Sequence, residues 1–111
     1  MARLPNYLRS NRKRLALSQE EVAFLLGTYG GVKVCRHEQF NQVPGLLVAL
    51  AYQVILQKSA SELFAGMYQQ VQREVLARAK VLAHRVDREK SNRQTALRRQ
   101  TLINIVNNSI N

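Results

Sequence analysis

Apolar residues recur every three to four positions along most of this chain, which is the spacing of one face of an α-helix. Val22, Leu25 and Leu26 share such a face, and the segment that contains them begins at Ser18 and ends at Gly27. Ser18, with a glutamate three residues later, has the spacing of a capping box, and Gly27 favours the left-handed conformation that ends a helix. The pattern therefore predicts a short helix between these two residues, with Val22, Leu25 and Leu26 facing inward.

The same periodicity predicts four more helices before Gly66. They are expected at about 5–15, 32–39 and 46–56 and in a short turn after Ser59, with Leu4, Leu8, Leu15, Leu63 and Phe64 as apolar positions. Pro5 suits the first turn of a helix, and Val34 is the expected buried anchor of the segment 32–39. The adjacent glycines Gly30 and Gly31 predict a turn before that segment.

The segment 46–56 is apolar around most of its circumference. A helix of this kind is either central to a core or shared with a partner, and in a small domain both can hold. Leu47 and Val48 are the positions that we expect to contact a second copy of the chain.

After Gly66 a single apolar stripe predicts a long amphipathic helix. Its members are Met67, Val71, Val75, Ala79, Leu82 and Val86. We expect Val71, Val75 and Leu82 to contribute to a contact between two copies. The stripe fades near Asp87, and the segment from there to its last isoleucine, Ile110, is compatible with a continued helix, a second short helix or a frayed tail. Two regions follow from this change of pattern: a domain over 1–66, and a helix with a basic tail over 67–111.

The net charge says more about binding partners than the overall composition does. The 111 residues contain 17 Lys and Arg against 7 Asp and Glu, a net charge of +10. The first region carries 8 − 4 = +4 and the second 9 − 3 = +6. Such an excess favours a polyanionic partner, either nucleic acid or an anionic membrane surface.

The location expected from the sequence is the cytoplasm. The N-terminus lacks the apolar run of a signal peptide, and the longest apolar stretch, 46–56, is too short to span a bilayer. Cys35 is the single cysteine, so an internal disulfide is excluded.

The sequence offers no candidate for catalysis. His37 and His84 lack the cysteines or acids that would complete a metal site, and Gly30-Gly31 lacks the lysine and hydroxyl of a phosphate-binding loop. We therefore expect neither an enzyme nor a metal, cofactor or small-molecule ligand.

A short capped helix, a tight turn and a second helix in a basic chain favour a helix-turn-helix that binds DNA. Lys33 and Arg36 are three residues apart, opposite Val34, and project from one outward face. In a major groove these two cations can contact guanine, and Val32 can contact a thymine methyl. Alternatively, Lys33 and Arg36 contact only phosphates or do not contact DNA at all. The polar loop residues assigned to the DNA backbone, each also readable as ordinary turn residues, are Tyr29, Asn41 and Gln42.

Several short segments occur in an order that resembles a known family. They are Arg9, Leu17-Ser18-Gln19-Glu20-Glu21, Leu26-Gly27, Val34-Cys35-Arg36-His37-Glu38, Pro44 and Glu62-Leu63-Phe64. Over about 4–64 they resemble the XRE-type, lambda-repressor-like helix-turn-helix domain. The resemblance implies an all-α fold of five helices, here followed by the long C-terminal helix and tail, and a bacterial or phage DNA-binding regulator that is typically a homodimer.

The resemblance also assigns roles to three residues. Gln19, in the first turn of its helix, would contact a phosphate, where the helix dipole favours an anion. Glu38, at the end of the recognition helix, would form an ion pair with Arg9 that fixes the angle of that helix.

The leading interpretation is therefore a sequence-preferring double-stranded-DNA-binding transcriptional regulator that acts as a homodimer. The alternative is a degenerate helix-turn-helix that serves as a protein-interaction module, with the C-terminal helix docking a partner protein. Gly30-Gly31 supports this alternative, because glycine has no side chain with which to contact a base. A basic amphipathic protein on a membrane surface ranks last, since the stripe over 67–86 lacks Trp and Phe.

Overall fold

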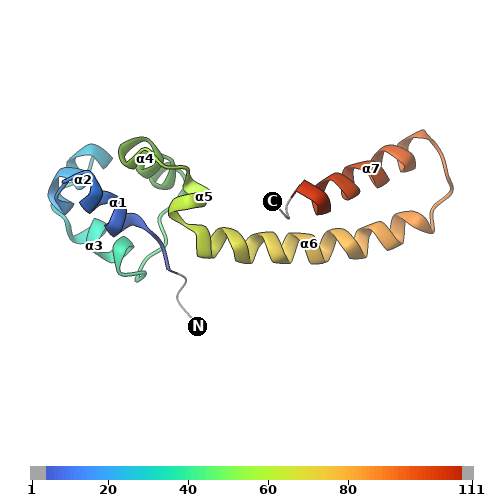
Figure 1. Ribbon diagram of the computed structural model, residues 1–111, viewed down its shortest axis with the longest axis horizontal. Helices are drawn as coiled ribbons and strands as arrows, with labels where there is room; N and C mark the ends of the chain where they lie inside the picture. Colours follow the sequence, from blue (N-terminus) through green and yellow to red (C-terminus); the bar gives the residue numbers. More distant parts are fainter. Residues whose placement is uncertain (1–4, 109–111) are drawn as a thin grey trace. The chain divides into compact units, whose positions relative to one another are not determined.

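A computed structural model describes residues 5–108, and every regular element within that range is a helix (Figure 1). The helices are α1 (Leu8–Arg14), α2 (Gln19–Leu26), α3 (Val32–Glu38), α4 (Leu46–Leu56), α5 (Ala60–Leu63), α6 (Ala65–Asp87) and α7 (Arg93–Asn108). The all-α prediction is confirmed. Contacts divide the chain into two compact units, Met1–Tyr68 and Gln69–Asn111.

The first unit has one apolar core to which α1–α5 all contribute. Its buried members are Leu8, Val22, Ala23, Val34, Tyr52, Leu56, Leu63 and Phe64. Val34 is completely buried, as its position in the apolar pattern predicts. The expectation for Leu25 is wrong, because its side chain is 54% exposed. Ala23 occupies the inward side of α2 together with Val22 and Leu26, and Leu25 lies outside that arc.

The first helix begins later than the sequence suggests, at Leu8 and not near Pro5. Hydrogen bonds hold the residues before it in a non-helical conformation. The Asn6 side chain accepts from the Leu8 backbone N–H (3.0 Å) and donates to the carbonyl of His37 (2.9 Å), and the Tyr7 backbone N–H donates to the carbonyl of Leu63 (2.8 Å). Leu8 is buried as expected, whereas the prediction for Leu4 lies outside the described residues.

Local signals set both ends of α2 as predicted. The Ser18 hydroxyl accepts from the Glu21 backbone N–H (3.0 Å), and the Glu21 carboxylate accepts from the Ser18 backbone N–H (2.8 Å). These two hydrogen bonds lower the pKa of Glu21 below its ordinary value. Gly27 ends the helix at a φ of 83°, a left-handed conformation that glycine adopts without strain.

The fourth helix has the predicted bounds and two apolar faces. Tyr52 and Leu56 are buried in the core, with Val48 packed beside them. Val48 is therefore partly covered by the core, and its expected contact with a second copy stays a prediction. The opposite face stays exposed, and together with Val43 in the preceding loop it is called the α4 stripe below. Its members on the helix are Leu46, Leu47, Leu50 and Val54.

The second unit is a helical hairpin in which α7 runs back along α6 (Figure 1). Its buried apolar residues are Ala79, Val86 and Leu102. Of the three alternatives that the sequence left open after Asp87, a second helix is the one observed. Thr95 and Asn92 cap it reciprocally, since Thr95 N–H donates to Asn92 Oδ1 (3.0 Å) and Asn92 N–H donates to Thr95 Oγ1 (2.8 Å). Ile110 lies outside the described residues.

The apolar stripe of α6 is only partly covered by α7. Ala79 and Val86 are buried, whereas Val71, Val75 and Leu82 are about half exposed. Two largely exposed ion pairs lie near the turn of the hairpin: Arg98 of α7 pairs with Glu89 in the turn (2.6 Å), and Arg99 of α7 pairs with Asp87 at the end of α6 (2.9 Å). Exposed pairs of this kind contribute little stability, so the small apolar seam is the main contact between α6 and α7.

Candidate nucleic-acid interface

The start of α3 lies against the first turn of α2. A Cβ added to Gly31 would be 3.0 Å from the Cβ of Gln19, closer than side chains normally approach. Gly30 beside it has a φ of 70°, a left-handed conformation that favours glycine because other residues adopt it only with strain. The glycine pair therefore allows the chain to turn sharply and to place the two helix N-termini side by side.

An open groove follows this junction along α3. It is lined by Gln19, Glu20, Gly31, Val32, Cys35, Arg36, Gln39 and Asn41. Four of the residues that the sequence assigned to DNA contact, namely Gln19, Val32, Arg36 and Asn41, are thus neighbours in space. Lys33, Tyr29 and Gln42 are exposed but do not line the groove.

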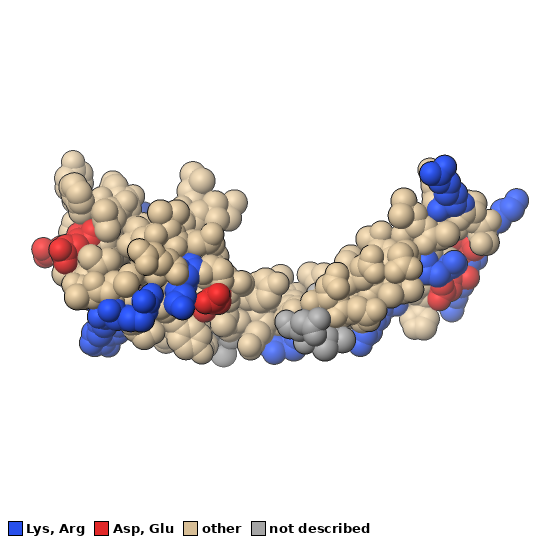
Figure 2. Space-filling view, turned by 45° about the horizontal axis from the view of Figure 1, so that its top comes forward, with Lys and Arg blue, Asp and Glu red and all other residues tan. Residues whose placement is uncertain are grey.

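The third helix is fixed by three buried side chains on its inner side. Val34, His37 and Glu38 are buried, and Val32, Lys33 and Arg36 are exposed. Lys33 and Arg36 therefore lie on the solvent side of α3, as the burial of Val34 requires. Figure 2 shows Lys and Arg side chains close together on one side of this unit. Cys35, between the two cations, is partly buried and has a free thiol.

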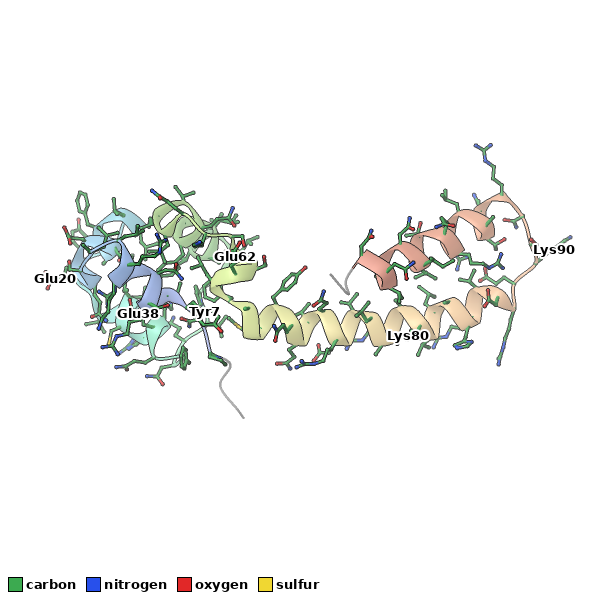
Figure 3. All side chains as sticks on the ribbon, viewed as in Figure 1. Tyr7, Glu20, Glu38, Glu62, Lys80 and Lys90 are labelled. Carbon is green, nitrogen blue, oxygen red and sulfur yellow. The ribbon has the colours of Figure 1, made fainter. Side chains whose placement is uncertain are left out.

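Glu38, labelled in Figure 3, is held by an arginine of α1, but that arginine is Arg12. Arg12 Nε donates to Glu38 Oε2 (2.6 Å) and Arg12 Nη2 donates to Oε1 (3.0 Å). The two side chains are only 11% and 3% exposed. The expected pairing of Arg9 with Glu38 is wrong, because Arg9 lies on the exposed side of α1.

This ion pair is the centre of a network that joins three helices. Arg12 Nη1 donates to the carbonyl of Leu17 (2.9 Å), just before α2, and the Gln19 side-chain amide donates to Glu38 Oε1 (3.1 Å). The hydrogen bonds with Glu38 raise the pKa of Arg12, although burial opposes the rise. Gln19 uses one amide hydrogen here and keeps a second for a further acceptor. The network thus sets the angle between α3 and the start of α2.

A second polar contact ties α3 to α4. His37 Nδ1 lies 2.8 Å from the Tyr52 hydroxyl, and the two rings meet edge to face. Among the described residues, His37 Nε2 is buried without a hydrogen-bond partner. Burial lowers the pKa of His37, and the positive charge of Lys33 lowers it further. Burial and the nearby charge of Glu38 raise the pKa of Tyr52. Both rings are therefore neutral near pH 7.

The loop after α3 is shaped by its backbone. Phe40 adopts a φ of 63° directly after the helix, and the Asn41 backbone N–H donates to the carbonyl of Arg36 (2.9 Å). The Asn41 side-chain amide donates to the Gln39 side chain (3.3 Å). This arrangement holds Asn41 beside the groove, whereas Gln42 is exposed next to it.

Sequence reasoning missed three residues of this region. Glu20 and Gln39 line the groove, and Arg12 anchors the recognition-helix candidate. A signal for Arg12 was present, because it follows the buried Leu8 by four residues and so shares its inward face. Glu20 and Gln39 had no such signal, since a polar residue on a helix gives no sign of the groove that it borders.

Neither a family model, nor a curated protein, nor a solved structure matches this chain. Within residues 5–108, no three or more His, Cys, Asp or Glu side chains are grouped so as to hold a metal ion. No helix in the same range combines the length and the apolar character needed to cross a membrane.

Proposed function

We propose that the protein is a sequence-preferring double-stranded-DNA-binding transcriptional regulator that acts as a homodimer. In this proposal α2 and α3 form a lambda-repressor-like helix-turn-helix, and α3 enters the major groove. The observation that supports it best is the exposure of Lys33 and Arg36 on a helix whose opposite side is locked by Val34 and Glu38.

The proposed contacts follow from chemistry and position. Arg36 can donate two hydrogen bonds to guanine, Lys33 can donate to guanine or phosphate, and Val32 offers a methyl surface to thymine. Gln19 and Asn41, at the two ends of the groove, are suited to phosphate oxygens. Tyr29 and Gln42, in the flanking loops, are assigned to the DNA backbone as well.

The exposed carboxylate of Glu20 gives the groove a selective element. It repels phosphate but can accept a hydrogen bond from the amino group of cytosine. Gln39 beside it can pair with adenine through its amide. Base recognition in this proposal therefore involves both cations and neutral or acidic groups, which favours sequence preference over indiscriminate binding.

The alternative, a protein-interaction module with a degenerate helix-turn-helix, draws its support from Gly30 and Gly31. The structure provides a packing reason for this pair, since Gly31 lies against Gln19 and Gly30 has a positive φ. The glycines are thus explained without loss of DNA recognition, and side chains for base contact are available one to five residues later. We therefore favour DNA binding over the interaction module.

The test is a fluorescence-anisotropy titration with a duplex selected from a random library and with an unselected duplex, across a salt series. For the double variant Lys33→Ala/Arg36→Ala we expect selectivity to fall about 30-fold or more, because each good base contact contributes about 1–3 kcal/mol. The matched control is Arg9→Ala/Lys58→Ala, which removes the same charge from exposed positions outside the groove.

The control should weaken binding to both duplexes about equally and preserve selectivity, since a lost phosphate contact or a lower net charge is sequence-independent. Equal losses of selectivity in the two double variants would refute the recognition role of α3. Failure of the wild-type protein to bind either duplex at low salt would refute DNA binding and leave the interaction module.

A further inference from the structure

The α4 stripe consists of five exposed apolar side chains, four on one face of α4 and one in the loop before it. Val43, Leu46, Leu47, Leu50 and Val54 are between 44% and 81% exposed. Leu46, Leu47, Leu50 and Val54 lie on one face of α4 opposite Tyr52 and Leu56, and Val43 lies in the loop just before this helix. Water therefore contacts mainly apolar side chains along this face of α4.

A face of this kind is unusual for a chain that stays monomeric. The largest apolar patches on monomeric proteins reach a few hundred Å², and larger ones generally indicate an interaction site. The five aliphatic side chains of the α4 stripe outnumber Val71, Val75 and Leu82 of α6, and most of them are more exposed. The α4 stripe is thus the stronger candidate for a protein contact.

The absence of charge on α4 indicates which kind of partner covers the α4 stripe. The helix Leu46–Leu56 has no charged residue, although the chain as a whole carries +10. Two copies can therefore pack α4 against α4 without burying like charges, because that helix has none. A uniform apolar face is also compatible with itself under a two-fold axis, where the same patch serves both partners.

The stripe is presented on a rigid support. Tyr52 and Leu56 fix α4 in the core, and the hydrogen bond between Tyr52 and His37 ties it to α3. A preformed helix face loses little conformational entropy on binding. The connection also means that a contact at α4 would fix the position of α3 in each copy.

We infer that the α4 stripe packs against the α4 stripe of a second copy of this chain. This inference rests on the proposed function, which requires two copies. A specific interface buries about 800 Å² on each partner, so the stripe forms the apolar centre and neighbouring residues form the rim. Leu47 belongs to this contact, as the sequence indicated, whereas Val71, Val75 and Leu82 lie outside it.

The experiment measures the mass of the full chain by size-exclusion chromatography with light scattering over a range of concentrations. The wild-type protein should approach twice 12.7 kDa. Leu47→Lys and Val54→Lys should each raise the dimer dissociation constant about 30-fold or more, because each places a charge at the centre of an apolar contact. Leu47→Gln, which adds no charge, should have a smaller effect in the same direction.

The matched controls are Val81→Lys on α6 and Leu97→Lys on α7, which change exposed aliphatic residues outside the stripe. Both should leave the dissociation constant unchanged. Circular dichroism checks that every variant retains its helix content, which is expected because the substituted side chains are largely exposed.

A wild-type protein that stays at 12.7 kDa at every concentration would overturn the inference. So would a dimer that the stripe variants and the controls affect equally. These outcomes are separate from the DNA titration: a dimer that dissociates on Leu47→Lys but binds no duplex refutes the proposed function alone. Selective DNA binding by a dimer that Leu47→Lys leaves intact refutes the α4 contact alone.

Discussion

Replacing Arg12 by alanine removes the guanidinium that neutralises a buried carboxylate. Glu38 would then keep only the hydrogen bond from the Gln19 side chain, and the carbonyl of Leu17 would lose its donor. A carboxylate that is 3% exposed cannot recover this loss from water without moving. The substitution therefore leaves an uncompensated charge inside the contact between α1, α2 and α3.

The magnitude follows from the burial of both partners. Breaking a buried pair by removing one side costs about 3–5 kcal/mol, whereas an exposed pair contributes about 0–1 kcal/mol. The two hydrogen bonds of 2.6 and 3.0 Å to one carboxylate place Arg12–Glu38 in the first class. Small domains are stable by about 5–15 kcal/mol, so Arg12→Ala should remove a substantial part of the total.

Urea denaturation followed by circular dichroism measures this loss as a shift of the unfolding midpoint. Arg9→Ala is the matched control, because it removes an exposed arginine from the same helix and should change the free energy of unfolding by less than about 0.5 kcal/mol. The double variant Arg12→Met/Glu38→Met should recover much of the stability, since an apolar pair of similar volume needs no charge compensation. A double-mutant cycle then isolates the coupling between the two residues.

The reasoning is refuted if Arg12→Ala and Arg9→Ala unfold at the same urea concentration. It is also refuted if the double variant is as unstable as the sum of its single changes, because the two residues would then act independently. The DNA titration adds a second measure: Arg12→Ala should weaken selective binding even where the domain remains folded, since it loosens α3.

The remaining predictions concern His37 and the turn before α3. Because the pKa of His37 is lowered in the folded protein, the unfolded chain binds a proton first as the pH falls below about 6.5. The free energy of unfolding should therefore decrease on acidification below that pH, and His37→Gln should reduce the decrease. An NMR titration that gives His37 a pKa at or above its ordinary value would contradict this. Gly31→Ala should weaken selective DNA binding because its Cβ would lie 3.0 Å from Gln19, whereas Gly45→Ala, where a Cβ meets nothing within 4 Å, should not; equal behaviour of the two variants would show that the close approach is unimportant.

Much of the local structure could be predicted because its causes lie within a few residues. The capping box at Ser18, the left-handed Gly27 and the bounds of Leu46–Leu56 all depend on neighbours in sequence. The burial of Val34 also followed from spacing, and with it the exposure of Lys33 and Arg36. The groove residues Glu20 and Gln39 could not be found in this way, because the groove exists only where two helices meet.

The sequence by itself determined which segments before about residue 87 are helical and most of the residues that face the core of the first unit. It did not determine how each helix is rotated about its axis when two faces are similar, and for this reason Val48 and not Leu47 faces the core. Spacing alone places Arg12 on the same face as the buried Leu8, but only the packing of α1 against α3 brings it to Glu38 in place of Arg9. Such choices depend on packing between segments that are distant along the chain, and a periodic pattern contains no information about that packing.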